Sequence, residues 1–190
     1  MPLIAYLKNT KLYIFVFLGL VMLLTRGDHL LTSVSLPDAS FALFLIGGIL
    51  LKKPKWFISF FTFSVLIDFV TLSLNNNYYI PINLGYLGLL PSYGLMWFFG
   101  SRIANTKSFL KFTAFSILAT FIAFLISTQT YNLLSGTFPG ITIKESILAG
   151  WEYLPQSLIY TMSYLIAYWG IQALIKRQFI SQKPTVLINA

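Results

Sequence analysis

The sequence predicts an all-α, polytopic membrane protein in which a single domain, residues 1–190, contains six transmembrane helices with both termini in the cytoplasm. Three observations support this fold class. Charged residues make up 9% of the chain and hydrophobic residues 57%, whereas soluble domains are roughly a quarter charged. Six apolar segments recur along the chain, and basic residues gather in alternate connections between them. Despite a net charge of +8, this composition excludes soluble enzymes and nucleic-acid-binding proteins.

The six apolar segments cover residues 11–25, 36–51, 55–74, 82–100, 108–134 and 154–174. A membrane-spanning helix needs about 20 mainly apolar residues, so the third, fifth and sixth segments are long enough unaided. The first covers only about 22 Å of a ~30 Å hydrocarbon core. We expect it to span with the help of Lys8 and Lys11, or to continue past Arg26 toward Leu31.

The distribution of basic residues sets the predicted topology. Eleven of the 13 Lys and Arg residues flank alternate connections, namely Lys8, Lys11, Lys52, Lys53, Lys55, Arg102, Lys107, Lys111, Lys176, Arg177 and Lys183. Only Arg26 and Lys144 belong to the other side. Because cytoplasmic connections carry the excess of Lys and Arg, this pattern predicts an even number of helices and cytoplasmic termini.

The first outer connection contains two features of interest. Ser35 or Asp38 can cap the second helix, and the alternative is that this helix start faces an entry vestibule. His29 is the only histidine and the chain has no cysteine. One imidazole cannot form a zinc site, but it can be a single axial ligand to a metal that a macrocycle already holds.

Asp68 is the one acidic residue inside a predicted span, about 20 Å from its cytoplasmic end. Ser64 and Thr71 share its helix face by spacing. A carboxylate in lipid is costly, so we expect it to face the bundle interior. Two interpretations remain open: a substrate-binding or proton-linked site, and a polar clamp between helices.

Uncharged polar groups follow in the third outer connection and in two helical stripes. Asn77, Tyr78 and Tyr79 can hydrogen-bond and stack against a large neutral ligand, or can belong to an ordinary turn and the interfacial aromatic belt. The fourth segment carries a stripe of residues at helical spacing: Asn83, Tyr86, Leu90, Tyr93 and Trp97. We expect Pro91 to kink this helix. The sixth segment carries a second stripe, preceded by Tyr153: Gln156, Tyr160, Tyr164 and Tyr168. We expect the outer halves of both stripes to line a cavity.

Two motifs resemble a known family. The stretch from Leu36 to Gly48, LPDASFALFLIGG, is similar to the second-helix start of small proteobacterial cobalamin transporters (BtuM-like). The stretch from Leu89 to Trp97, LLPSYGLMW, is similar to their fourth helix. These proteins are related to the substrate-binding S-components of energy-coupling-factor systems. The resemblance implies six helices in the bacterial inner membrane and cobalamin as the transported substrate, with no intrinsic cofactor.

The sequence departs from this family at two points. The resemblance implies a cobalt-ligating cysteine in the third outer connection, where this chain has Tyr78, Tyr79 and Ile80; His29 is the strongest alternative ligand. S-components commonly carry an Ala-x-x-x-Ala patch on helix one, where this chain has Gly19 alone. An energy-coupling ATPase module is therefore a conceivable partner that the chain does not require.

The residues together predict a non-enzymatic vitamin uptake protein, with cobalamin or a related corrinoid as the first candidate substrate. Its predicted binding residues are His29, Asp68, Asn77, Tyr78, Tyr79, Asn83, Tyr86, Tyr93, Tyr153, Gln156 and Tyr160, with His29 as the candidate cobalt ligand. The alternatives are an S-component for another vitamin, an intramembrane enzyme that uses Asp68 and His29, and a structural subunit.

Overall fold

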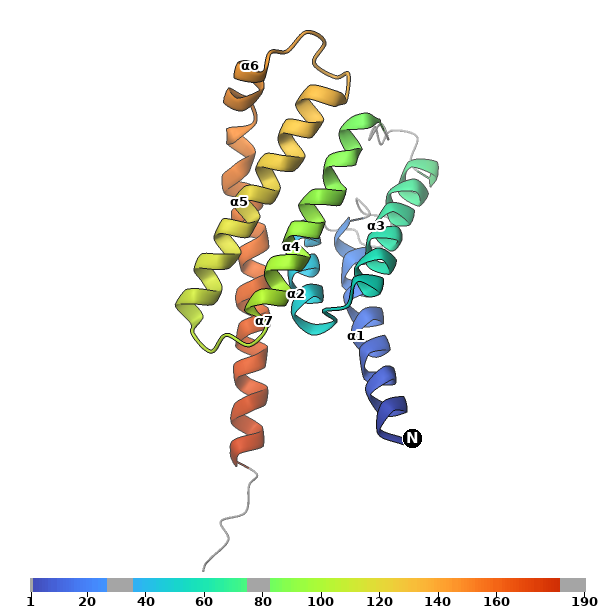
Figure 1. Ribbon diagram of the computed structural model, residues 1–190, viewed down its shortest axis with the longest axis vertical. Coiled ribbons are helices and arrows are strands. Elements are labelled where there is room, and N and C mark those ends of the chain that lie inside the picture. Colours follow the sequence, from blue (N-terminus) through green and yellow to red (C-terminus); the bar gives the residue numbers. More distant parts are fainter. Residues whose placement is uncertain (1, 27–35, 75–82, 182–190) are drawn as a thin grey trace, which may run out of the picture.

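A computed structural model describes residues 2–26, 36–74 and 83–181 of the chain (Figure 1). Within these ranges the protein is all-helical and has no strand. The elements are α1 (Pro2–Arg26), α2 (Ser40–Leu50), α3 (Pro54–Leu74), η1 (Leu84–Gly88), α4 (Leu89–Ile103), α5 (Phe109–Leu134), α6 (Ile143–Leu148), η2 (Trp151–Tyr153) and α7 (Leu154–Ser181). Among the described residues, three stretches are long and apolar enough to cross a membrane: Pro54–Leu74, Phe109–Leu134 and Ile143–Gln178.

The six predicted segments correspond in order to α1 to α5 and α7, but the first two differ in length from the prediction. Helix α1 has 25 residues, about 37 Å, because it begins nine residues before the apolar segment. Helix α2 has only 11 residues, about 16 Å, which is roughly half of a ~30 Å hydrocarbon core. Nine of those 11 residues are buried. It is therefore an internal helix of the bundle.

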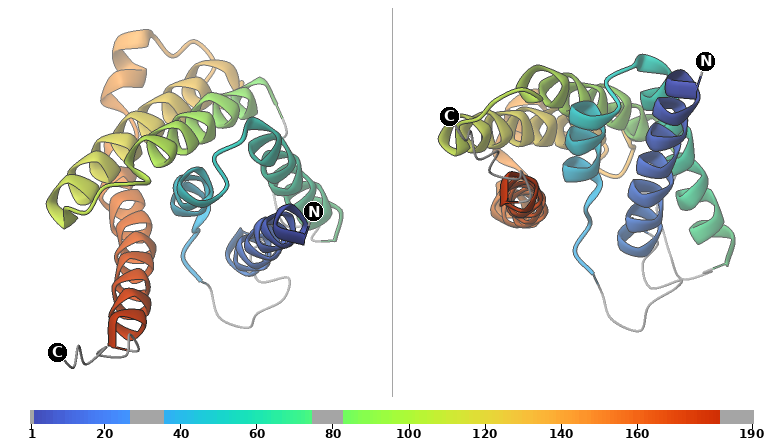
Figure 2. Two further views of the ribbon diagram at one scale, coloured as in Figure 1. Left: turned by 60° about the horizontal axis from the view of Figure 1, so that its bottom comes forward. Right: turned by 90° about the horizontal axis from the view of Figure 1, so that it is seen from below.

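Helix α2 lies at the centre of the molecule and contacts α1, α3, α4, α5 and α7 (Figure 2). Its closest neighbour is α4, and glycines on both helices make that approach feasible. A Cβ atom on Gly48 would overlap the carbonyl oxygen of Trp97, and one on Gly100 would overlap that of Leu45. Only glycine lets the two backbones come this close.

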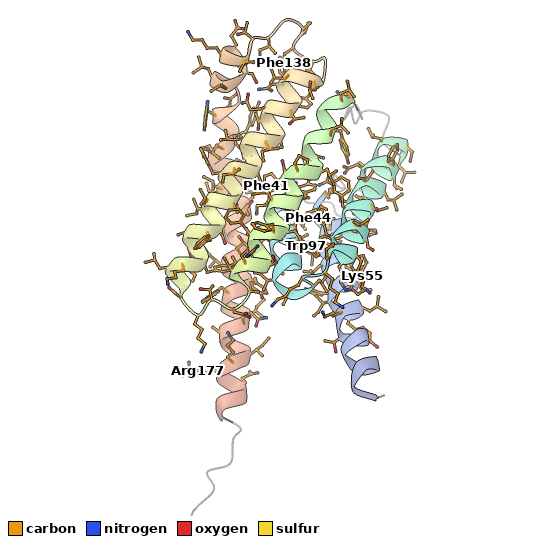
Figure 3. The ribbon with its side chains drawn as sticks, viewed as in Figure 1. Phe41, Phe44, Lys55, Trp97, Phe138 and Arg177 are labelled. Carbon is orange, nitrogen blue, oxygen red and sulfur yellow. The ribbon has the colours of Figure 1, made fainter. Side chains whose placement is uncertain are left out.

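Aromatic side chains fill the space between α2, α3 and α4 (Figure 3). The rings of Phe44 and Tyr93 stack with centroids 4.2 Å apart, and Phe60 meets Phe44 edge-on at 5.0 Å. Trp97 closes the cluster against Phe57 at 5.7 Å. This packing fixes the orientation of the α4 face that carries Tyr93.

The fourth predicted segment is two elements rather than one helix. Residues 84–88 form the 3₁₀ helix η1, and α4 begins only at Leu89. Pro91 therefore lies in the first turn of α4, where a missing N–H breaks no helical hydrogen bond, and the expected mid-helix kink is replaced by this junction. The predicted stripe does not lie on one buried face, because Leu90 is 49% exposed while Tyr93 and Trp97, on the same helix α4, are buried.

The two ends of the bundle differ in charge. The N-terminus and the C-terminal end of α7 lie at the same end (Figure 1), and Lys55 and Arg177 lie toward it, whereas Phe138 lies at the opposite end (Figure 3).

At the Phe138 end, the backbone N–H and hydroxyl of Thr142 donate to the Glu145 carboxylate, and Glu145 N–H donates back to the Thr142 hydroxyl. These hydrogen bonds form a capping box that satisfies free backbone N–H groups at the start of α6.

Candidate functional site

A cavity of about 750 Å³, with polar groups set in a largely apolar wall, opens at the end of the bundle opposite the basic residues. We call it the polar cavity. Its wall comes from the end of α1, from α3 and η1, from the last turns of α5, and from the segment that joins α6 to α7. The polar and aromatic residues lining it are Arg26, Asp68, Asn83, Tyr86, Ser127, Thr128, Tyr131, Asn132, Phe138, Glu152 and Tyr153.

An ion pair between α1 and α3 forms part of the wall. Arg26 Nε donates to Asp68 Oδ1 and Arg26 Nη2 donates to Oδ2, both at 2.7 Å. Their side chains are only 9% and 5% exposed. The fork of the guanidinium matches the carboxylate, which is the geometry that best compensates two buried charges. The pair is neutral as a unit.

Three more polar side chains complete what we call the Arg26 cluster: Arg26, Ser40, Asp68, Tyr86 and Tyr93. Arg26 Nη1 donates to Ser40 Oγ at 2.7 Å and to Tyr93 Oη at 2.5 Å. The Tyr86 hydroxyl donates to Asp68 Oδ2. The cluster joins α1, α2, α3, η1 and α4 through hydrogen bonds on one side of the polar cavity.

The start of α2 is fixed from outside the cluster. Asp38 Oδ1 accepts hydrogen bonds from the Ser40 backbone N–H at 2.9 Å and from the Ser40 hydroxyl at 2.6 Å. Asp38 thus satisfies a free N–H at the helix start, as the sequence predicts. The Tyr164 hydroxyl of α7 donates to the carbonyl oxygen of Pro37 at 2.8 Å, which ties α7 to the same segment.

Asn83, which lines the polar cavity, has one unused hydrogen-bond donor. Its Oδ1 accepts the Gly85 N–H at 2.9 Å and caps η1. Its Nδ2 is buried and has no partner within the described residues. An unmade buried hydrogen bond costs roughly 1–3 kcal/mol.

The structure brings some of the predicted binding residues together and separates others. Asp68, Asn83, Tyr86 and Tyr153 line the polar cavity. Tyr93 is buried behind it, stacked on Phe44 and bonded to Arg26. Gln156 and Tyr160, joined by a 2.9 Å hydrogen bond, line a smaller cavity of about 260 Å³ that also borders Asp38 and Tyr153. His29, Asn77, Tyr78 and Tyr79 lie outside the described residues.

The prediction that Asp68 faces the interior is confirmed, since it, Ser64 and Thr71 are all buried. The ion pair with Arg26 joins α3 to α1, which is the contact that the clamp interpretation expects. A role in binding substrate or moving protons stays a prediction. The predicted enzyme pairing of Asp68 with His29 also stays untested, because His29 is not described.

Sequence reasoning missed Arg26 as a site residue and missed the contribution of α5. Arg26 had a signal: it is one of two basic residues on the acidic side of the chain, and Asp68 is the one acid that needs a partner. The end of α5 also had a signal in the sequence, because its residues are mostly apolar up to Ile126 and polar from Ser127 to Asn132. Both signals gain meaning only when the helices are placed beside each other.

No group of three or more His, Cys, Asp or Glu side chains that could hold a metal ion occurs in residues 2–26, 36–74 and 83–181. The polar groups in the wall of the polar cavity are phenols, hydroxyls and amides around one neutral ion pair, with the exposed carboxylate of Glu152 at its edge. Such a lining suits reversible binding of a large solute through hydrogen bonds and ring contacts.

No protein-family model matches this chain, and no curated protein matches it either.

Proposed function

We propose that the protein is a vitamin uptake protein of the bacterial inner membrane, with six helices in the membrane and both termini in the cytoplasm. The substrate enters the polar cavity from the periplasmic side and leaves toward the cytoplasm. The observation that carries the proposal is the 750 Å³ cavity at the end of the bundle opposite the basic residues. A cavity of this size lies in the ~300–1,000 Å³ range of small-molecule sites.

The lining favours a substrate that is largely uncharged and carries both ring faces and oxygen acceptors. Arg26 and Asp68 neutralise each other. Tyr86, Tyr131 and Tyr153 offer rings and hydroxyls, and Ser127 and Thr128 offer further hydroxyls. Cobalamin or a related corrinoid is the first candidate, because the second-helix and fourth-helix motifs resemble those of cobalamin transporters.

Tyr153 borders both the polar cavity and the smaller one. A corrin is larger than most drug-sized ligands, and we expect it to extend from one cavity toward the other past this side chain. His29 remains the candidate axial ligand to cobalt.

A second candidate is an S-component for a smaller vitamin, working with an energy-coupling ATPase module. The size of the polar cavity alone favours it, since 750 Å³ is ample for a vitamin of ordinary size.

Growth rescue tests the proposal with a matched pair of variants. The chain is expressed in bacteria that lack their own cobalamin importer and grow on limiting vitamin. Thr128→Trp places a large ring in the polar cavity, whereas Leu118→Trp places the same ring on the 47% exposed outer face of the same helix. We expect rescue by the parent chain and by Leu118→Trp, and at least tenfold weaker rescue by Thr128→Trp at equal expression.

Equal rescue by both variants would place the substrate elsewhere. Failure of the parent chain to rescue, together with rescue of a strain that lacks an importer for another vitamin, would replace cobalamin by the second candidate. Failure in every such strain would refute uptake.

A further inference from the structure

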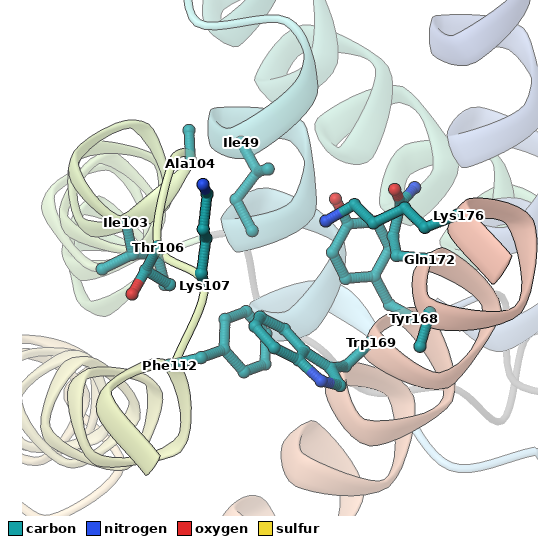
Figure 4. Close-up of a pocket in the computed structure, with 11 residues that line it drawn as sticks. Ile49, Ile103, Ala104, Thr106, Lys107, Phe112, Tyr168, Trp169, Gln172 and Lys176 are labelled. Carbon is teal, nitrogen blue, oxygen red and sulfur yellow. The ribbon is translucent and has the colours of Figure 1, made fainter. Parts of the chain in front are cut away.

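A second sizeable cavity, of about 470 Å³, lies at the basic end of the bundle (Figure 4). We call it the basic-end cavity. Helices α2, α4, α5 and α7 and the α4–α5 connection enclose it, so it is separate from the polar cavity at the opposite end. Its lining shares no residue with that of the polar cavity.

The lining of the basic-end cavity combines two kinds of side chain. Lys107 and Lys176 come from opposite sides, one from the α4–α5 connection and the other from α7 (Figure 4). Phe112 and Trp169 form an apolar base, with ring centroids 4.8 Å apart. Phe112 is only 1% exposed, so this base is a fixed part of the core.

Within the described part of the chain, neither of the two lysines forms an ion pair with an acidic residue. The four described acids are engaged elsewhere: Asp68 and Glu152 at the polar cavity, Asp38 at the start of α2, and Glu145 in the cap of α6. An anion between the two ammonium groups would therefore gain attraction from both without displacing a protein carboxylate.

An apolar groove of about 480 Å³ adjoins the basic-end cavity. Tyr168 and Gln172 line both of them. From there the groove runs between α1 and α7 over α2, past side chains such as Ile14, Phe17 and Ile46. A ligand that fills both spaces needs an anionic head and a long apolar tail.

We propose that the basic-end cavity binds the headgroup of an anionic phospholipid from the leaflet around it, with one acyl chain in the apolar groove. The proposal rests on the membrane placement in the proposed function. Basic pockets between helices at the cytoplasmic side are the sites at which membrane proteins hold anionic headgroups. The phosphate lies between Lys107 and Lys176, and the glycerol end faces Phe112 and Trp169. This lipid joins α7 to the α4–α5 connection.

Lipid binding to the purified, delipidated chain tests the proposal. The protein in a neutral detergent is titrated with phosphatidylglycerol or with phosphatidylcholine of the same acyl chains, and bound lipid is counted by native mass spectrometry. We expect one retained phosphatidylglycerol. The double variant Lys107→Gln/Lys176→Gln should bind it about 30-fold more weakly, since each lysine near a lipid phosphate contributes about a fivefold factor.

The control is the double variant Lys53→Gln/Lys111→Gln, which removes two exposed charges from the same end without touching the cavity. It should bind phosphatidylglycerol as the parent chain does. An equal loss of phosphatidylglycerol affinity in the control would show that net charge alone explains the binding, and would overturn the proposal. Equal binding of phosphatidylcholine would do the same.

A competition experiment with glycerol phosphate distinguishes a lipid from a free phosphorylated solute. Competition by glycerol phosphate at the concentration of the lipid would show a site for a free phosphorylated solute and overturn the lipid assignment. The readout involves no vitamin, so a chain that binds phosphatidylglycerol but rescues no growth would keep this site and lose the proposed uptake function.

Discussion

At the scale of single residues, Arg26 decides the character of the polar cavity. A lone Asp68 in the bundle would be a costly charge, and a lone Arg26 would be an anion site. Their bidentate contact at 2.7 Å turns both into a neutral, hydrogen-bonded wall. The guanidinium also donates to Ser40 and Tyr93, so its Nε and both of its terminal nitrogens are in use.

Replacing either partner alone should destabilise the protein strongly. Arg26→Gln or Asp68→Asn leaves the other charge buried without compensation, which costs roughly 3–5 kcal/mol. The double variant Arg26→Met/Asp68→Leu should cost less than either single variant, because no unpaired charge remains. Thermal unfolding in mild detergent measures the differences.

Glu152→Gln is the matched control for Asp68→Asn, because both change a carboxylate at the polar cavity to an amide but Glu152 is exposed. We expect its unfolding temperature to stay within a degree or two of the parent value, as for most surface substitutions. A cost for Asp68→Asn no larger than that of Glu152→Gln would show that the ion pair does not hold α1 to α3.

At the scale of elements, the contact between α2 and α4 organises the bundle. Helix α2 is short, nearly all buried and pressed against α4 at Gly48 and Gly100. Because α4 carries Tyr93 on the same side, this contact also sets where Tyr93 meets Arg26. The position of the Arg26 cluster thus depends on glycines outside it, about two helical turns after Ser40 on α2 and after Tyr93 on α4.

Gly48→Ala and Gly100→Ala should each destabilise the protein by about 1–3 kcal/mol or more, since the new Cβ atom would overlap backbone of the facing helix and force the helices apart. Gly170→Ala is the control: Gly170 lies in α7, and a methyl group added there would meet no atom of the described residues within 4 Å. Alanine at this position should be neutral or stabilise by up to about 1 kcal/mol. Equal unfolding temperatures for the three variants would contradict the close contact.

At the scale of the whole molecule, charge divides the protein into two ends with different chemistry. The basic residues and the basic-end cavity lie at one end, and the polar cavity lies at the other. The N-terminal end of α1 and the C-terminal end of α7 both lie at the basic end (Figure 1). In a bilayer this asymmetry predicts a single orientation, with the basic end in the cytoplasm.

The absence of cysteine makes that orientation easy to test. Single-cysteine variants Lys53→Cys and Lys144→Cys are treated in intact spheroplasts with a membrane-impermeant maleimide. We expect Lys144→Cys to react at once and Lys53→Cys to react only after the membrane is opened. The reverse pattern would invert the topology, and labelling of both would show that the two positions share a side.

The sequence determined the helical class, the approximate positions of six helices, the separation of basic from acidic residues, and the inward face of Asp68. These are local properties: apolar length, helical spacing and the cost of a charge in lipid act within one segment. They also place Asn83, Tyr86 and Tyr153 near one end, where the structure finds them around a cavity.

Only the tertiary structure decided that α2 is an internal helix rather than a full span, that residues 84–88 form a 3₁₀ helix, and that Arg26 is the partner of Asp68. It also decided that Gln156 and Tyr160 border a different cavity from Asp68. These outcomes depend on which helix faces which. A backbone approach through Gly48 and Gly100, or an ion pair across 42 residues of sequence, gains its energy from two surfaces meeting and therefore leaves no periodic trace in either segment alone.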